Sequence, residues 1–239
     1  MTEIEHIKNK IEKSFNQIIF EKENHTYHLK KKQLFSVSSR ISNYKSKFDT
    51  HRIATAYAKK KRLKVDDVIK EWSDINKQSI DLGHRVHDFG EIYFIDKTIE
   101  PELPQEKAII AYWNSIPEHE IPVMCETIVY SEQLGYAGTF DLLFYDTIKK
   151  GLIIKDWKSN KDIYKNFNNK KMNKPFDFLL DMPLSAYELQ LSYYQIPLED
   201  IGLNVIGREV IWLKDDETFE VIQTTDYSQH IRYYESLRN

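Results

Sequence analysis

The fold is decided by two stretches, Gly135–Asp141 (GYAGTFD) and Ile153–Lys158 (IIKDWK), each of which has the apolar character of a buried strand. Alternate residues of a strand face the same side, so the side chains of Asp156 and Lys158 are expected to project together. The short polar turn between the two stretches predicts an antiparallel hairpin, which would bring Asp141 beside Asp156. Because a buried carboxylate needs a metal ion or a cationic partner, the hairpin predicts a site where a divalent metal and a reacting phosphate meet.

The chain has the composition of an ordinary globular protein. Its 239 residues, of which 41% are hydrophobic and 30% charged, are enough for one core, or for one core with a small appendage. No apolar run approaches the roughly 20 residues of a membrane span, and residues 1–5 lack the basic-then-apolar order of a secretory signal. The single cysteine, Cys125, excludes an internal disulfide and a four-cysteine zinc or iron–sulfur site. We therefore expect a cytoplasmic protein without a membrane partner.

The net charge of −3 is a poor guide to nucleic-acid binding. A phosphate-cleaving site concentrates carboxylates, while local basic patches hold the phosphate backbone. Three segments are basic enough to act as such patches: Lys30–Lys32, Lys59–Lys64 and Lys165–Lys174. Each segment could equally be a solvated surface, so its meaning depends on whether it lies near the carboxylates.

Hydrophobic periodicity predicts a chain in which helices and strands are mixed. Helices are expected over residues 1–16, 50–96, 105–115, 183–195 and 226–238, with a further start at Ser38 or Ser39, and additional strands over 17–20, 26–29, 34–38, 122–132, 204–213 and 218–223. The polar stretch 159–181 is long for a loop of a compact domain and is expected to be functional or mobile. The order predicts an α/β fold with a mixed central β-sheet flanked by helices and a helical N-terminal region. We expect residues 1–121 to pack on a core of residues 122–239 as one compact domain.

Five motifs, read together, resemble those of a known family. They are Gly83–His87 (GHRVH), Glu126 on the first core strand, Gly138–Asp141 (GTFD), Asp156–Lys158 (DWK) and Gln190–Tyr194 (QLSYY). In this order they resemble the PD-(D/E)XK nuclease superfamily, in its RecB-type branch. That branch includes phage recombination exonucleases such as lambda exonuclease, the mitochondrial genome maintenance exonuclease and the CRISPR-adaptation nucleases. The resemblance covers roughly residues 17–223 and implies a restriction-endonuclease-like αβββαβ core.

The resemblance implies a role for each residue of the central group. Asp141 and Asp156 are expected to be catalytic and to bind Mg²⁺ or Mn²⁺, which prefer oxygen ligands. His87 and the backbone carbonyl of Trp157 are implied as further metal ligands, and an imidazole would favour Mn²⁺. Lys158 would orient or deprotonate the attacking water and balance the charge of the transition state.

Neighbouring acidic and imidazole groups leave alternatives open. Glu91 lies one helical turn after His87 and could hold the imidazole or meet a second metal. Glu126 could be a ligand or simply a solvated strand residue. His84 competes with His87, although the G-x-x-x-H spacing favours His87, and Asp88 is expected to face away on the surface.

Substrate contacts are expected from one helix and one loop. We expect Gln190, Tyr194 and Tyr187 to share a helix face and to contact the substrate backbone or brace the metal-bearing strands. The loop is expected to act as a lid whose lysines meet phosphates while Phe167 and Phe176 stack on bases, or else to be a plain surface loop. Its candidate lysines are Lys161, Lys170, Lys171 and Lys174. The Lys59–Lys64 run is a further candidate for the lining of the same channel.

Taken together, these features predict a divalent-metal-dependent deoxyribonuclease. We expect an exonuclease that acts on single strands or free ends of DNA in phage or bacterial recombination, replication or repair, with a recombinase or single-strand-binding protein as a possible partner. A structure-specific endonuclease and an inactive nucleic-acid-binding module remain alternatives. No iron–sulfur cluster is expected, and the chain lacks the G-x-x-x-x-G-K-[ST] loop of a fused ATPase.

Overall fold

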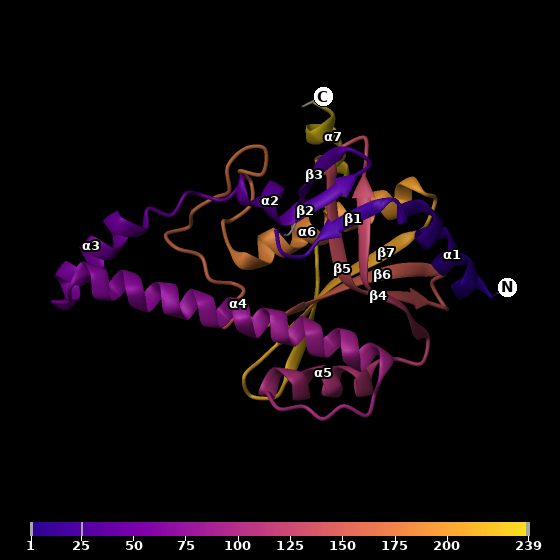
Figure 1. Cartoon of the computed structure of the whole chain (residues 1–239), viewed down its shortest axis with the longest axis horizontal. Coiled ribbons are helices and arrows are strands. Elements are labelled where there is room, and N and C mark those ends of the chain that lie inside the picture. Colours follow the sequence, from indigo (N-terminus) through magenta and orange to yellow (C-terminus); the bar gives the residue numbers. More distant parts are fainter. Residues whose placement is uncertain (1, 25, 238–239) are drawn as a thin grey trace.

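The computed structural model describes residues 2–24 and 26–237, which form one eight-stranded sheet with helices on both faces (Figure 1). The elements are α1 Glu3–Phe15, β1 Ile18–Glu21, β2 Thr26–Leu29, β3 Lys32–Ser36, α2 Val37–Ser42, α3 Thr50–Lys61, α4 Val65–Ile95, α5 Pro104–Ser115, β4 Glu120–Ser131, β5 Tyr136–Asp146, β6 Gly151–Lys158, α6 Pro183–Asp200, β7 Val205–Leu213, β8 Phe219–Gln223 and α7 Ser228–Ser236. No helix of the described chain is both long and apolar enough to cross a bilayer.

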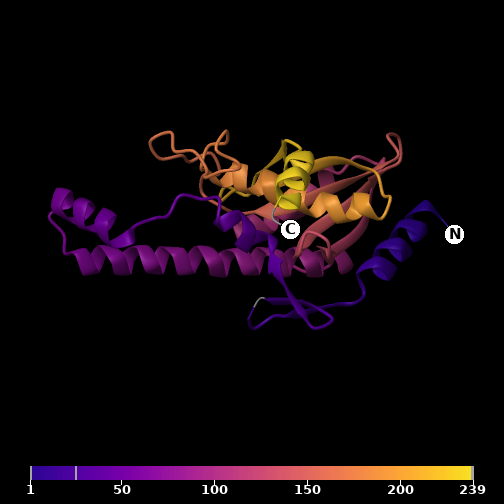
Figure 2. The same ribbon diagram turned by 90° about the horizontal axis from the view of Figure 1, so that it is seen from above.

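The sheet is mixed, as the sequence predicts. Its strands follow the order β1-β2-β3-β5-β6-β7-β8, with β4 paired to β5 outside this path. The β3–β5 and β6–β7 pairs are parallel and the others antiparallel. One hydrophobic cluster joins the sheet to α1, α2, α6 and α7, and a second joins its other face to α4 and α5 (Figures 1 and 2). The α/β prediction is confirmed, and this sheet takes strands from both sides of residue 121.

The strands β5 and β6 separate where the predicted carboxylates lie. Their antiparallel pairing runs from Asp146↔Gly151 to Leu142↔Lys155 and stops there. Beyond this point β6 continues beside β7, while β5 meets β3 only at Tyr136 and Ala137. Asp141 and Asp156 are therefore the first residues inside a fork between two strands, a position where polar side chains can enter the sheet.

The two faces of β6 carry different chemistry. Trp157 packs in the cluster under α4 and α5, and Lys155 lies on that same side between the rings of Tyr112 and Phe144. The buried Lys155 ammonium is neutralised by two carboxylates: its Nζ lies 2.5 Å from Glu120 and 2.8 Å from Glu209. Buried charges survive only when paired in this way. The alternation leaves the other face of β6 to Asp156 and Lys158.

Three element boundaries differ from the sequence predictions. The helical region 50–96 is two helices, because Arg62 adopts a left-handed conformation (φ 57°) that ends α3. The preceding helix, α2, begins at Val37 and not at Ser38. Its N-terminus is capped by Ser36, whose hydroxyl accepts a hydrogen bond from the Ser39 N–H. Helix α6 continues to Asp200 through an internal Pro197, where a proline suggested an earlier end.

The polar stretch 159–181 is anchored by three of its own apolar residues. Ile163, Met172 and Phe176 are buried at 0%, 2% and 0% exposure, and the Phe176 ring packs edge-on to Tyr44. The Asn173 N–H also donates to the Tyr44 carbonyl. The expectation that Phe176 stacks on bases is therefore wrong. Burial of the ring in the core removes its apolar surface from water, which is more favourable than leaving it exposed on the loop. Phe167, at 63% exposure, remains on the surface.

Helix α4 approaches β6 unusually closely at Gly90. A Cβ built on Gly90 would lie 2.7 Å from Nε1 of the buried Trp157, nearer than real Cβ contacts allow. In the same helix, a Cβ on Gly83 would meet nothing within 4 Å. The contact sets the distance of α4 from the sheet. Because His87 lies one helical turn before Gly90, the same contact fixes how close His87 comes to the strands.

We expect Gly90→Ala to lower the free energy of unfolding by about 1–3 kcal/mol, because the methyl group forces Trp157 or α4 to move. The matched variant Gly83→Ala should be neutral or stabilising by up to about 1 kcal/mol, since alanine favours helix. Urea denaturation of both variants measures the difference. Equal effects of the two substitutions would contradict the close-packing argument.

Candidate metal centre

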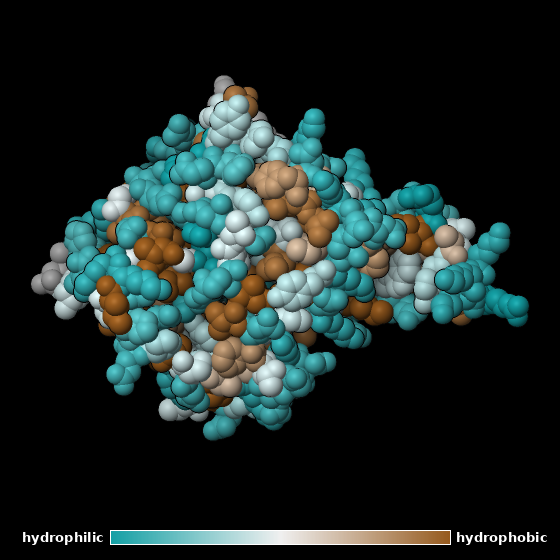
Figure 3. All heavy atoms as spheres, turned by 180° about the vertical axis from the view of Figure 1, so that it is seen from behind, coloured by the Kyte–Doolittle hydropathy of each residue, from teal (hydrophilic) through white to brown (hydrophobic). Residues whose placement is uncertain are grey.

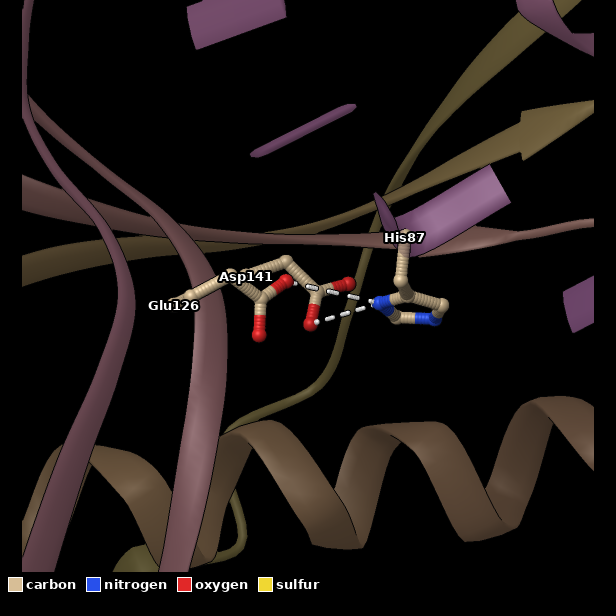
Figure 4. A group of neighbouring side chains, drawn as sticks. All are labelled: His87, Glu126 and Asp141. Carbon is tan, nitrogen blue, oxygen red and sulfur yellow. Dashed lines mark ion pairs between the residues drawn. The ribbon is translucent and has the colours of Figure 1, made fainter. Parts of the chain in front are cut away.

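Three side chains from three different elements converge at the mouth of the fork. Nδ1 of His87 lies 3.3 Å from an Asp141 carboxylate oxygen and 3.6 Å from a Glu126 oxygen. One potential ligand atom from each residue lies within 4.8 Å of the other two. Figure 4 shows both carboxylates pointing at the imidazole ring. The group can supply one nitrogen and at least two oxygen ligands to a single cation.

The backbone brings Glu126 into this group through an unusual conformation. The register pairs on either side, Cys125↔Leu142 and Thr127↔Phe140, place Glu126 opposite Asp141. Glu126 itself has φ 41°, in the left-handed region that strand residues other than glycine rarely adopt. Such strain costs on the order of 1–3 kcal/mol and is concentrated at functional sites. The left-handed residue is an indication, independent of charge, that this position is functional.

Opposite charges hold Asp141 ionised despite its burial. The residue is 5% exposed, and burial alone would raise its pKa, but His87 and Lys158 outweigh this effect and keep the pKa below its ordinary value. The Trp157 N–H also donates to Oδ2 at 2.7 Å. The Asp141 charge in turn raises the pKa of His87 to about 10, against the opposing effect of burial. Without a metal, His87 is therefore a cation at neutral pH.

The carboxyl groups of Asp156 and Glu126 have raised pKa values, because burial disfavours their charged forms. Burial, followed by the charge of Asp141, raises the pKa of Asp156 to about 6. Burial likewise raises the pKa of Glu126 to about 7. Three acidic groups so close together cannot all ionise freely, which is the usual condition of a site built for a cation.

Asp156 and Lys158 form a buried ion pair beside the group of three. Burial opposes the charge on Lys158, but Asp156 and Asp141 outweigh it and raise the lysine pKa above its ordinary value. The Lys158 Nζ also lies 4.8 Å from the centroid of the Tyr187 ring. Oδ2 of Asp156 contacts the Lys158 ammonium, whereas Oδ1 is buried without a hydrogen-bond partner among the described residues. This second oxygen is the one that remains available to a cation.

The group opens into a cleft of about 620 Å³. On one side the Gln190 amide donates to the Tyr194 hydroxyl at 2.7 Å, and Tyr194 covers Gly138, where any Cβ would lie 2.5 Å from the ring. The glycine of the GTFD motif thus makes room for the aromatic of the QLSYY motif. The two motifs meet at the cleft wall next to Asp141.

The structure separates the remaining predicted ligands from the group of three. Glu91 lines the cleft and adds negative charge near Glu126, but it is not among the three converging side chains. His84 also lines the cleft. Asp88 is exposed and outside the group of three, as predicted, but its position is at the cleft and not away from it. Trp157 touches the group through its amide, so the ligand role of its carbonyl stays a prediction.

The predicted lysines of the loop do not reach the cleft. All four are exposed, and none lies along its wall: Lys161, Lys170, Lys171 and Lys174. Tyr187 is nearer, since its ring contacts Lys158 and its hydroxyl lies 2.5 Å from Asn160 Oδ1. The Lys59–Lys64 run does not line the cleft either, because it lies at the far end of α4. The number of lysines in a segment therefore does not predict whether that segment lies at the cleft.

Sequence reasoning missed the outer wall of the cleft. This wall comes from the N-terminal strands and the start of α2: Phe20, Lys22, Tyr27, Ser36 and Ser38. It is tied to β5, the strand that carries Asp141, by a contact of 3.2 Å between the hydroxyls of Tyr27 and Thr139. No motif marked these residues, since they reach the site through tertiary contacts and the short β3–β5 pairing.

The donor set fits a divalent cation of the Mn²⁺ or Mg²⁺ type. Carboxylate oxygens suit both ions, and an imidazole nitrogen favours Mn²⁺. The buried Oδ1 of Asp156, which has no partner among the described residues, supplies a further acceptor beside the group. A cation would relieve the repulsion among the three carboxylates, so His87, Glu126 and Asp141, with Asp156 adjacent, are the residues that can hold it.

No protein-family model matches this sequence, and no curated protein does. Among solved structures, the chain is similar to one from Eubacterium rectale described as a "putative exonuclease", with a TM-score of 0.39 and 14% sequence identity. The match covers 85% of this chain and 77% of that chain. So distant a likeness carries no argument about activity, and function has to be argued from the site itself.

We expect Asp141→Asn, His87→Gln and Glu126→Gln each to weaken Mn²⁺ binding at least ten-fold, because each removes one donor from a three-donor group. Isothermal titration calorimetry measures the affinity. Asp88→Asn is the matched control: it lines the same cleft outside the group and should change the affinity less than two-fold. Unchanged binding in all three ligand variants would show that the metal, if bound, lies elsewhere.

We also expect Mn²⁺ to raise the melting temperature more at pH 8 than at pH 6. Glu126, with a pKa of about 7, is mostly protonated at pH 6, and His87, with a pKa of about 10, carries a proton at both values. A metal must displace these protons, so its affinity rises with pH, and the stabilisation follows the affinity. Differential scanning fluorimetry with and without Mn²⁺ measures the shift. A larger shift at pH 6 would contradict the assignment, and Glu126→Gln should reduce the pH dependence.

Proposed function

We propose that this chain is a divalent-metal-dependent deoxyribonuclease that hydrolyses phosphodiester bonds, acting at DNA ends. One observation carries the proposal: a three-donor group (His87, Glu126, Asp141) and Lys158 line one cleft at a strand fork, and the buried Asp156 behind the cleft wall pairs with Lys158. The order of motifs in the sequence supports the same reaction class. Preference for ends rests on the resemblance to RecB-type exonucleases.

The side chains divide the chemistry in a consistent way. A bound divalent cation would supply positive charge to the phosphate and lower the pKa of a water molecule. Asp141 and Glu126 would hold that cation, and His87, once deprotonated, would complete the set. The carboxylates also explain why the site should not bind DNA productively without a cation, since they repel phosphate.

Lys158 is best suited to act as a positive charge. Its raised pKa keeps it protonated at neutral pH in the metal-free protein, whereas a general base works best with a pKa near the working pH. The ammonium is held in place by Asp156 and lies at the cleft wall. It would therefore orient the attacking water and stabilise the charge that develops on the phosphate.

The cleft wall offers contacts for the rest of the substrate. Tyr194 and Gln190 form a hydrogen-bonded pair next to Asp141 and present polar groups to a sugar or phosphate. Lys22 adds a cation on the opposite wall. These groups would position the strand while the central residues act on one bond.

We expect Lys158→Ala, Asp141→Asn and Asp156→Asn each to lower the cleavage rate by at least 10²-fold, the usual loss when a charge-stabilising group is removed. The assay uses linear DNA labelled separately at each end, together with circular DNA, in Mn²⁺, Mg²⁺ or EDTA. Lys161→Ala is the matched control, an exposed lysine outside the cleft that should retain full activity.

The products discriminate among the alternatives. Metal-dependent cleavage of linear but not circular DNA supports end-dependent action, and the ladders give the polarity. Cleavage of circular DNA would replace the exonuclease with an endonuclease. Binding of DNA without cleavage in any metal would overturn the enzymatic proposal in favour of an inactive binding module.

A further inference from the structure

Helix α3 and the N-terminal half of α4 form a helical arm, residues 50–81, that projects from the body of the protein (Figures 1 and 2). The two helices are joined by a small apolar contact among Ala54, Ala58 and Val68. The C-terminal half of α4, in contrast, is held on the core by buried residues such as Val86 and Tyr93. One helix thus links the metal centre to a distant tip.

The middle of this helix has no tertiary cover. Every residue from Ser73 to Asp81 is exposed, over about two and a half helical turns. Helices in proteins normally gain most of their stability from packing one face against a core. A helix that is bare all round spans the distance between two structures. The core of this protein therefore does not account for the length of α4.

The tip of the arm concentrates positive charge. The arm, residues 50–81, contains eight Lys and Arg and five Asp and Glu, which gives 8 − 5 = +3 in a chain of net charge −3, and five of its eight basic residues fall between 59 and 64. The five basic residues nearest the tip are exposed and make no ion pair with any described residue: Lys59, Lys60, Lys61, Arg62 and Lys64. Figure 3 shows hydrophilic side chains at the end of the arm.

The charge exceeds what the helix itself requires. Lysines in the last turn of α3 interact favourably with the helix dipole, but that effect is confined to the final turn. Arg62 and Lys64 lie beyond the helix end and add to the same cluster. Along α4, Lys70, Lys77 and His84 recur at seven-residue spacing, and Asp67, Asp74 and Asp81 recur at the same spacing beside them. The shaft of the arm therefore carries no net basic row, and its positive charge is confined to the tip.

The length of the helix matches a repeat of DNA. From Val65 to His87 there are 22 steps along the helix, which at a rise of 1.5 Å per residue is about 33 Å. One turn of B-form DNA is about 34–36 Å, or 10–10.5 base pairs. We propose that the helical arm binds the phosphate backbone of duplex DNA about one helical turn from the bond held at the metal centre. This inference rests on the proposed nuclease function and extends it to substrates with a double-stranded flank.

The pattern on α4 favours DNA over a lipid surface. A helix that lies on a membrane carries its apolar residues on one face. The exposed Ile75 and Ile80 are five residues apart, about 140° around the helix, and so do not share a face. Asp74 and Asp81 are also exposed on this segment. A narrow, linear polyanion matches a bare helix with a basic tip better than a flat surface does.

The test measures binding to fluorescent blunt duplexes of 6, 8, 10, 12, 16 and 20 base pairs by anisotropy. Ca²⁺ replaces Mn²⁺ in the buffer, so that a cation neutralises the carboxylates, and a gel of each sample shows that the duplex stays intact. Wild type should gain at least ten-fold in affinity between 8 and 12 base pairs, where the duplex first reaches the tip. The triple variant Lys59→Gln, Lys60→Gln, Lys61→Gln should lose this step. Its slope of log affinity against log salt should be shallower by about 2–3, or 0.9 per lost phosphate contact.

Two controls separate local charge from folding and from total charge. Replacing Lys8, Lys10 and Lys13 of α1 by Gln removes the same charge at the opposite end of the molecule (Figure 2) and should leave the step in place. Replacing Lys59, Lys60 and Lys61 by Arg keeps the charge and should restore it. Circular dichroism confirms the helical content of each variant.

The outcomes decide between this inference and the function beneath it. A gradual rise of affinity with length in wild type, or an intact step in the arm variant, overturns the inference. Stronger loss of binding to phosphatidylserine vesicles than to DNA would overturn it in favour of a membrane. Cleavage by wild type in Mn²⁺ is scored separately. Cleavage without a step in affinity supports the nuclease function and contradicts DNA binding by the arm. A step in affinity without cleavage supports DNA binding by the arm and contradicts the nuclease function.

Discussion

The hydrogen bond from the Trp157 N–H to Asp141 Oδ2, 2.7 Å long, closes the fork between β5 and β6, and the rest of the site depends on it. Past Leu142↔Lys155 the two strands no longer pair, so their polar groups would be left unsatisfied. The Asp141 carboxylate takes the place of the lost backbone partner. It is thereby fixed in direction, with its other oxygen free to face His87.

Charge is balanced at this fork only in part. Three carboxylates, Glu126, Asp141 and Asp156, face two cations, His87 and Lys158, in a largely buried space. Burial and mutual repulsion raise the pKa of two of the acids, and the left-handed backbone of Glu126 adds local strain. The surrounding packing, including the close approach of Gly90 to Trp157, holds the groups in place. Unfavourable backbone conformations and perturbed pKa values are concentrated at functional sites, and both occur together at this fork.

The two halves of helix α4 have different surroundings. Its C-terminal half is anchored by Val86, Phe89 and Tyr93 and so fixes His87 to within the reach of a single cation. Its N-terminal half leaves the core and carries a basic tip about 33 Å away. A rigid helix transmits position over that length better than a loop of the same number of residues would. His87 and the basic tip of the arm thus belong to one continuous helix and its neighbouring turn.

Local periodicity determined much of this protein: the strands, their hairpin, and the opposite directions of Asp156 and Trp157, because a strand's alternation depends on no distant residue. Motif spacing also pointed to His87. Only the tertiary structure decided that Glu126 turns into the site, that Phe176 enters the core and that the loop lysines stay outside the cleft. Those outcomes depend on which distant surfaces compete for each side chain, and composition does not record that competition.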